Sequence, residues 1–267
     1  MAPGTDLSFL AGEISAALDT TLPTKTAKIS SATPSQGIIV LDPSLIPTDF
    51  DLLRFEAAAY GQLHIAPDRD DNHDESSHAS GSPLLSSLLI SSPYNNPGHY
   101  LDLASLDTSN FLLSKALTAL KPLRSDYATA PYTEALNLDF VVELLGKFAA
   151  DEKFEWKEQA FYVVSFRSKL MEVVDNELLY TLDYESHREA CESGGLLKYW
   201  FGAPNGERRN LATCFWRSRE DARLGGLGPW HKKARSAGRE LYGSIVFSTH
   251  RFTILDGATG FKFEDWE

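Results

Sequence analysis

One histidine near the C-terminal end of this chain has the surroundings that general-base chemistry needs. His231 follows Gly228, Pro229 and Trp230, and a Gly-Pro pair of this kind is typical of the first turn of a helix. The free N–H groups at a helix N-terminus favour anions and lower the pKa of a nearby imidazole. A neutral imidazole can hold or deprotonate an acidic substrate, so His231 is the candidate catalytic residue. Its alternative role is that of a helix cap or a surface residue.

Aromatic and polar side chains in the neighbouring strand-like segments are candidates for binding a small-molecule ligand. They are Trp216, Tyr199, Trp200, Arg167 and His250. Aromatic rings provide apolar pocket walls, and arginine or histidine can hold an anionic or phenolic group. Alternation along a strand does not reveal which parity faces inward. The same rings could therefore form the core or an interface, with the arginine exposed.

Neither a metal nor an organic cofactor is expected. The chain has only two cysteines, whose spacing is not that of metal ligands, and we interpret both as reduced core residues. His73 and His78 lie in an acidic, Ser-rich segment, and a mobile segment does not hold metal ligands in a fixed geometry. The sequence lacks a phosphate-binding loop, a dinucleotide-binding glycine motif and an HExxH zinc motif.

The charge of the chain argues against nucleic acid and anionic membranes as partners. Its formal net charge is −12, which repels phosphate backbones and anionic lipid headgroups. The segment Arg208–Arg251 differs, because it has ten Lys and Arg against three Asp and Glu. This positive segment could hold an anionic ligand such as a carboxylate, or it could contact the acidic N-terminal part of the same chain.

The N-terminal segment does not have the pattern of an export signal. Its first residues, MAPGTDLSFLAGEISAALDT, contain neither a basic region nor a continuous apolar region. No stretch of the chain approaches the roughly 18 apolar residues that would span a bilayer. We therefore expect a soluble protein of the cytoplasm, or of the cytoplasm and the nucleus.

The five ligand-binding candidates lie on segments with the composition of β-strands. These segments are rich in β-branched and aromatic residues. The Asn205-Gly206 pair between two of them is a strong signal for a hairpin turn. We therefore predict four antiparallel strands, at residues 161–168, 196–202, 209–217 and 244–255.

Helical patterns separate these strands. Asp183 could cap a first helix, which the pair Gly194 and Gly195 could end. Ser218 could cap a second helical region, in which Pro229 begins a further helix. The order strand, helix, strand, strand, helix, strand is that of a split βαβ module. The predicted fold class is therefore α+β, with a ferredoxin-like antiparallel sheet and a mostly helical N-terminal extension.

We divide the chain into three parts. Residues 1–95 form the N-terminal extension, with a strand candidate at Gly37–Asp42 and an acidic loop at 67–83 that we expect to be disordered. Residues 96–156 form a helical segment with two amphipathic stripes that need an apolar surface to cover. Residues 157–256 form the ferredoxin-like module, on which we expect the helical segment to pack.

The best helical patterns of the N-terminal parts have recognisable ends. A short helix is predicted at Asp49–Leu63. Asp107 or Thr108 could cap a longer one, which Pro122 would end. A third pattern runs from about Thr133 to Ala149, with apolar residues at helical spacing.

A characteristic segment covers the end of the third predicted strand and the start of the next helices. It is CFWRSREDARLGGLGPWHKKA, from Cys214 to Ala234. This segment resembles the strand-to-helix signature of the dimeric α/β barrel superfamily, whose best-known members are antibiotic-biosynthesis-type monooxygenases. Trp216 and Ser218 stand where that superfamily has a Trp and a Ser, and His231 lies close to one of its histidines. Gly225 stands where many members have a further histidine.

The barrel resemblance implies a homodimer. The two helices of a βαββαβ module cover one face of its sheet, and two free faces can pack together and enclose a pocket. The sequence leaves open whether the helical segment 96–156 covers that second face instead.

A longer resemblance extends from about Asp102 to Leu255. Its characteristic runs are DYATAPY, FYVVSFRS and GGLLKYWFG. Over this span the chain resembles an uncharacterised family of fungal proteins, which implies no particular activity.

Two functions are consistent with these features. The first is a small-molecule-binding barrel protein that acts as a cofactor-independent monooxygenase, isomerase or cyclase on an aromatic or anionic substrate. His231 would be its base, and Trp216 and Tyr199 its pocket walls. The second is a non-catalytic binding or stress-associated protein, whose barrel is filled by side chains. A fold alone does not decide between them. An open cavity of roughly a few hundred Å³ beside His231 would favour the first.

Overall fold

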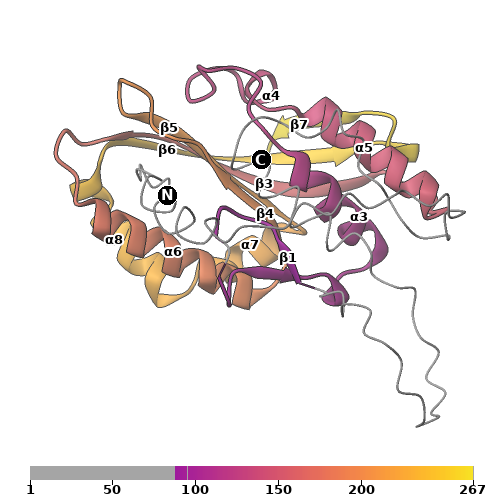
Figure 1. Ribbon diagram of the computed structural model, residues 1–267, viewed down its shortest axis with the longest axis horizontal. Helices are drawn as coiled ribbons and strands as arrows, with labels where there is room; N and C mark the ends of the chain where they lie inside the picture. Colours follow the sequence, from indigo (N-terminus) through magenta and orange to yellow (C-terminus); the bar gives the residue numbers. More distant parts are fainter. Residues whose placement is uncertain (1–87, 95, 267) are drawn as a thin grey trace, which may run out of the picture.

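The computed structural model describes residues 88–94 and 96–266 (Figure 1). They form a mixed α+β structure with a two-stranded and a five-stranded antiparallel sheet, which confirms the predicted class. Within these ranges, none of the helices has the length and apolar character needed to cross a membrane. The predicted strand Gly37–Asp42, the predicted helix Asp49–Leu63 and the loop 67–83 lie outside the described residues.

The main sheet has the strand order β4-β5-β3-β6-β7, and every neighbouring pair is antiparallel. The four strands expected from the sequence are all present, with slightly different ends. The bounds are β3 Gln159–Leu170, β4 Leu196–Phe201, β5 Arg209–Trp216, β6 Tyr242–Ile254 and β7 Phe261–Asp265.

The predicted hairpin joins β4 and β5, but its turn differs from a tight Asn-Gly turn. The side chain of Asn205 accepts hydrogen bonds from the backbone N–H groups of Glu207 and Arg209. Arg208, with a φ of 65°, adopts the left-handed conformation expected of Gly206. Asn205 therefore organises the turn through its side-chain oxygen.

β7 is the strand of the main sheet that sequence patterns did not predict. It follows a 3-10 turn, Asp256–Ala258, in which Gly257 has a φ of 66°. β7 pairs with His250–Ile254 of β6, at the edge of the sheet. Its pattern is short and most of its residues are exposed or half-buried, so the local signal for a strand is weak.

Three helices connect the strands on one side of the sheet. α6, Asn176–Ser193, joins β3 to β4, whereas α7, Arg219–Gly225, and α8, Pro229–Leu241, lie between β5 and β6. The side chain of Ser218 accepts a hydrogen bond from the third residue of α7, which confirms the predicted cap. Pro229 occupies the first turn of α8, also as predicted.

The start of α6 corrects one prediction. Asp175 is the N-cap, since its side chain accepts a hydrogen bond from the N–H of Leu178. Asp183, the predicted cap, lies in the middle of the helix and is buried. The apolar stripe of α6 begins earlier than the prediction allowed, because Leu179 and Leu182 also pack into the core.

The segment before the sheet is largely helical. It contains α3, Thr108–Ala116, which continues into a 3-10 turn, Leu117–Ala119, and it also contains α4, Tyr132–Ala135, and α5, Leu138–Asp151. Of the two predicted caps, Asp107 is the one that caps α3, because its side chain accepts a hydrogen bond from the third residue of the helix.

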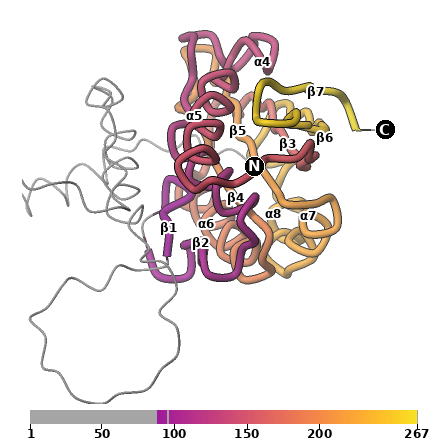
Figure 2. The backbone as a smooth tube through the Cα atoms, turned by 90° about the vertical axis from the view of Figure 1, so that its right-hand side faces the viewer, coloured from indigo at the N-terminus to yellow at the C-terminus, as the bar shows by residue number. Residues whose placement is uncertain are grey.

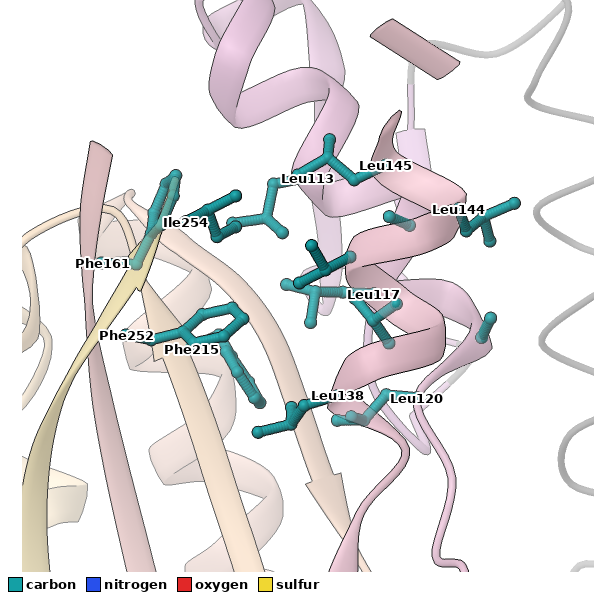
Figure 3. Close-up of a cluster of buried hydrophobic side chains, with 14 of the residues drawn as sticks. Leu113, Leu117, Leu120, Leu138, Leu144, Leu145, Phe161, Phe215, Phe252 and Ile254 are labelled. Carbon is teal, nitrogen blue, oxygen red and sulfur yellow. The ribbon is translucent and has the colours of Figure 1, made fainter. Parts of the chain in front are cut away.

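The largest core lies between the sheet and these helices. Figure 3 shows Leu113, Leu117 and Leu138 of the helical layer facing Phe161 and Phe215 of the sheet, and all five side chains are fully buried. Each contributes about 1.5 to 3 kcal/mol relative to an exposed position. The helices therefore cover the sheet face that a second sheet would contact in a face-to-face dimer.

The opposite face of the sheet lies toward α6, α7 and α8. Phe161 and Val163 of β3 point into the core beneath α3 and α5, whereas Tyr162 and Val164 belong to a separate cluster on the other face. Figure 1 shows α6 and α8 on one side of the strands and α5 on the other. Both faces of the sheet are covered by helices of this chain.

A small hairpin completes the described structure. β1, Leu88–Ile90, pairs with β2, Tyr100–Asp102, and a 3-10 turn, Leu103–Ser105, follows. Figure 2 shows this hairpin beside α6 and β4. The N–H of Tyr199 in β4 donates a hydrogen bond to the carbonyl oxygen of Ser91, 2.9 Å away. The hairpin is thereby fixed at the edge of the main sheet.

Candidate functional site

A cavity of about 1010 Å³ lies between the sheet and the helices α6, α7 and α8. Its sheet wall is largely aromatic, with Tyr162, Phe166, Tyr199 and Trp216 among the lining residues. These side chains alternate with those that fill the core beneath α3 and α5. A mostly apolar cavity of this size can accommodate a small organic molecule.

Small residues form part of the helical wall of the cavity. Ala190 of α6, Ala222 of α7, Gly226 after α7, and Ala234 and Gly238 of α8 all line it. A Cβ atom at Gly238 would meet no heavy atom within 4 Å, so the space beside this residue is open. The cavity exists because these short side chains do not reach across to the sheet.

His231 lines this cavity, and Glu189 of α6 holds its ring in place. Nδ1 of His231 lies 3.0 Å from Oε2 of Glu189. The same carboxylate accepts hydrogen bonds from the backbone N–H groups of Trp230, at 2.7 Å, and of His231, at 3.0 Å. Glu189 therefore caps the N-terminus of α8 from a neighbouring helix and orients the imidazole.

The hydrogen bonds of Glu189 determine which nitrogen of His231 can act as a base. Burial alone would raise the pKa of Glu189, but the hydrogen bonds from Trp230 and His231 outweigh it and lower this pKa. An ionised carboxylate only accepts hydrogen bonds, so Nδ1 of His231 carries the proton that is donated to it. Burial lowers the pKa of His231, against the raising effect of Glu189. The neutral ring thus keeps its lone pair on Nε2.

A second titratable group of the cavity wall is Asp183, in the middle of α6. The hydroxyl groups of Tyr94 and Tyr199 each donate a hydrogen bond to its carboxylate, the latter at 2.7 Å. Burial raises the pKa of Asp183 to about 6, although both hydrogen bonds lower it. A carboxyl with this pKa changes its protonation near neutral pH and can exchange a proton with a bound molecule.

His187 lies one helical turn after Asp183 and also lines the cavity. Its Nδ1 is 2.8 Å from Nδ1 of His99, and the two rings are parallel. Burial lowers the pKa of His187 well below its usual range, and it lowers that of His99 to about 4. Both rings are therefore neutral at pH 7, and one of the two Nδ1 atoms donates to the other.

Both cysteines are free thiols beside this site. Sγ of Cys191 lies 3.7 Å from the ring nitrogens of His187. Burial raises the pKa of Cys191 and of Cys214 to about 12. Both side chains stay protonated at neutral pH, so neither is a reactive nucleophile.

Trp216 lines the cavity, and Gly225 at the end of α7 lies against its ring. A Cβ atom at Gly225 would lie 2.4 Å from Cη2 of Trp216. Any larger residue at this position would displace the indole. Close packing therefore accounts for a glycine at this position.

Of the five ligand-binding candidates, Trp216 and Tyr199 line the cavity, together with the catalytic candidate His231. Trp200, Arg167 and His250 lie on the other face of the sheet and do not line it. Alternation along the strands separates Tyr199 from Trp200, and only the packing of the helices decides which parity faces the cavity.

These three residues have structural partners on their own face. The guanidinium of Arg167 donates hydrogen bonds to the carbonyl oxygens of Tyr127, Ala128 and Ala130, in the loop before α4. Nε2 of His250 lies 3.1 Å from the hydroxyl oxygen of Ser165, and Nδ1 lies 3.0 Å from Oδ1 of Asp265. Trp200 packs edge-on against Tyr127 in the core.

The polar residues that α6 contributes to the cavity were not predicted, although their spacing in the sequence is regular. Asp183, Ser186, His187 and Ala190 follow one another at i, i+3, i+4 and i+7, and all four line the cavity. This spacing places the four residues on one face of α6, and the apolar residues Leu179 and Leu182 show that the helix is buried on that side. Within the described part of the chain, no group of three or more His, Cys, Asp or Glu could hold a metal ion.

Comparison with known proteins places this architecture in a family. A family model described as PB2B2.08-like matches residues 90–265, more than half of the chain. The chain belongs to the PB2B2.08-like family. It is similar to UPF0643 protein PB2B2.08 of Schizosaccharomyces pombe (strain 972 / ATCC 24843), with 37% identity over 186 residues, which cover 66% of this chain and 84% of that protein. The expected resemblance to a fungal protein family is confirmed.

The region that matches the PB2B2.08-like family contains the complete candidate site. It begins at the last residue of β1 and ends in β7, so it includes β2, both helical layers and the main sheet. All the residues that line the cavity lie within it. The further resemblance to the dimeric α/β barrel superfamily stays a prediction.

Proposed function

We propose that this protein binds a small aromatic molecule in the cavity between the sheet and α6–α8, and that His231 removes a proton from it. The observation that carries this proposal is the Glu189–His231 pair on the wall of a cavity of about 1010 Å³. The carboxylate orients the ring and stabilises the imidazolium that forms, while Nε2 accepts the proton. No cofactor takes part in this step.

The chemistry is that of an isomerase or cyclase. Nε2 of His231 takes a proton from a phenolic O–H or from a C–H next to a carbonyl group, and the substrate becomes an anion. Return of the proton to a different atom, or attack of the anion on an electrophilic carbon of the same molecule, completes the reaction. In a cofactor-independent monooxygenase the anion would react with O₂ as co-substrate. One oxygen atom would enter the product as a carbonyl, the other would leave as water, and the substrate would supply the electrons.

The proposal includes a ferredoxin-like module related to the dimeric α/β barrel type, with α3 and α5 on the face where that barrel has its second sheet. The order β4-β5-β3-β6, with α6 between β3 and β4 and α7 and α8 between β5 and β6, supports it. One edge of β6 supports a homodimer. On this edge, the described part of β7 pairs only with the second half of β6, His250–Ile254. In the first half Ile245, Val246 and Phe247 are exposed, and an apolar strand edge favours pairing with a second copy.

A variant that fills the cavity tests the binding part of this proposal. Gly238→Leu places a side chain in the open space beside α8, and Ser236→Leu places the same side chain on the exposed face of the helix. Native mass spectrometry of the purified full chain should show a small molecule bound to the wild type and to Ser236→Leu, and its loss from Gly238→Leu. Retention by Gly238→Leu would contradict a ligand in this cavity.

The catalytic part has a separate readout. Wild-type protein should exchange the acidic C–H of the bound molecule for deuterium in D₂O, as followed by NMR, whereas His231→Ala should bind the molecule without this exchange. If the bound molecule has such a C–H, binding without exchange in the wild type would favour the second candidate, a non-catalytic binding protein. The internal hydrogen bonds of Asp183 and His187 are the observation in favour of that role, because both groups already have protein partners.

A further inference from the structure

Three arginines and one glutamate line the part of the cavity that α7 and α8 form: Arg219, Arg223, Arg235 and Glu220. All four are exposed to solvent. Glu220 pairs with Arg223, at 2.7 Å between Oε1 and Nη2. Among the described residues, neither Arg219 nor Arg235 forms an ion pair. An apolar cavity therefore opens beside two guanidinium groups whose charge no described carboxylate balances.

Arg235 is held where it can reach a bound molecule. Its Nη1 donates a hydrogen bond to the carbonyl oxygen of Gly226, 2.9 Å away, which fixes one edge of the guanidinium and leaves its other N–H groups available. Arg235 also lies four residues after His231, on the helix face that lines the cavity. Four residues of helix correspond to about 6 Å along its axis. An anion bound by Arg235 would thus place the adjoining part of a ligand next to His231.

We propose that the cavity takes an aromatic carboxylic acid, with its carboxylate bound by Arg235 and Arg219 and its ring against the aromatic wall formed by Tyr162, Phe166 and Trp216. This inference rests on the proposed function, because it names the class of molecule that His231 acts on. Arginine matches it well, since a guanidinium presents paired N–H groups to the two oxygens of a carboxylate. The apolar body of the acid leaves water when it enters the cavity.

The alternative explanation for acid binding is the diffuse positive field of the segment Arg208–Arg251. Arg239 provides the matched control for this explanation. It lies one helical turn after Arg235 on α8 and is exposed, but it does not line the cavity. Arg235→Gln and Arg239→Gln remove the same charge from the same helix. A direct contact depends on Arg235 and not on Arg239, whereas a diffuse field weakens equally in both variants.

The test compares 2-naphthoic acid with its neutral isostere 2-naphthamide, by isothermal titration calorimetry on the full chain at low ionic strength. Wild-type protein should bind the acid about tenfold more tightly than the amide, which corresponds to one charge-assisted contact. Arg235→Gln should remove most of this preference and leave the affinity for the amide unchanged, and Arg239→Gln should behave as the wild type.

Each other outcome overturns a defined part of the argument. Equal binding of acid and amide by the wild type would leave a small-molecule cavity but would refute the carboxylate site. An equal loss in Arg235→Gln and Arg239→Gln would also refute it, in favour of the diffuse field. If neither probe bound and Gly238→Leu carried the same copurified molecules as the wild type, both the carboxylate site and the proposed function would be wrong.

Discussion

Oε2 of Glu189, on α6, lies 3.0 Å from Nδ1 of His231, on α8, and the same carboxylate accepts the backbone N–H groups that begin α8. One side chain thus joins two helices and sets the orientation of the candidate base. The closest neighbours of His231 in sequence contribute the helix start, but they do not provide the acceptor for Nδ1. The pKa of His231 therefore depends on the charge of Glu189.

Replacement of Glu189 by glutamine should lower the pKa of His231 further. The carboxylate raises this pKa against the lowering effect of burial, and the amide keeps the size of the side chain without its charge. NMR titration of the imidazole should show protonation at a lower pH than in the wild type. Glu192→Gln, an exposed change on the same helix, should leave the titration unchanged. A higher pKa in Glu189→Gln would show that the carboxylate does not act on the ring.

Replacement of His231 by alanine should cost little stability compared with that of Trp216. Glu189 keeps two backbone hydrogen bonds when the imidazole is removed, so the loss is about 1 kcal/mol. Trp216→Ala removes a buried indole and should cost about 3 to 5 kcal/mol. Urea unfolding of both variants measures the difference. A loss for His231→Ala as large as that for Trp216→Ala would assign His231 to the core.

Two glycines beside the cavity should respond to alanine in opposite directions. Gly225→Ala brings a methyl group into the ring of Trp216 and should destabilise the protein by about 1 to 3 kcal/mol. Gly238→Ala adds a methyl group to open space within α8 and should stabilise it by about 0.5 to 1 kcal/mol through helix propensity. Thermal unfolding distinguishes the two. The same sign for both variants would contradict the packing described for this wall.

Arg167 should matter for stability and not for ligand binding. Its guanidinium bonds three backbone carbonyls on the face opposite the cavity, and removal of a charged donor from such acceptors costs about 1.5 to 3 kcal/mol. Arg167→Lys should recover little of this, because a lysine ammonium does not reproduce the planar fork. Urea unfolding and 2-naphthoic acid titration give the two readouts. Loss of acid binding by a fully folded Arg167→Lys would place this residue in the site after all.

The stability of the protein should fall as the pH is lowered from about 6.5 to 4. Burial lowers the pKa of His99 to about 4 and that of His187 further, from a usual value of 6.5. The unfolded chain therefore binds more protons than the folded protein in this window, which favours unfolding. Asp183 acts in the opposite direction, because its raised pKa of about 6 lets the folded protein take up a proton first.

Urea unfolding at a series of pH values checks this balance. Since His99, His187 and His231, whose pKa values burial lowers, oppose one carboxyl group, the free energy of unfolding should decrease toward acid pH. His187→Gln should weaken the dependence, by up to about 1.4 kcal/mol per pH unit for one proton. Asp183→Asn should steepen it. A protein that becomes more stable between pH 6.5 and 4.5 would show that Asp183 outweighs these histidines.

The sequence by itself determined the features that depend on neighbouring residues. The strand composition of β3, the side-chain cap of Ser218 on α7 and the start of α8 at Pro229 follow from local propensities and hydrogen bonds. The cap of α6 was wrong because Asp175 and Asp183 have the same capping chemistry. The choice between them depends on how far the apolar stripe of the helix extends against the sheet.

Only the tertiary structure decided which side chains share the cavity. Tyr199 and Trp200 are adjacent in β4, and an irregular register between Leu196 and Lys198 helps to set which of them turns toward α6. Glu189 and His231 are 42 residues apart, and they meet because α6 and α8 pack side by side. Such pairings depend on the way in which apolar faces are buried between layers. Local composition does not encode them, since many chain-distant partners would satisfy the same local pattern.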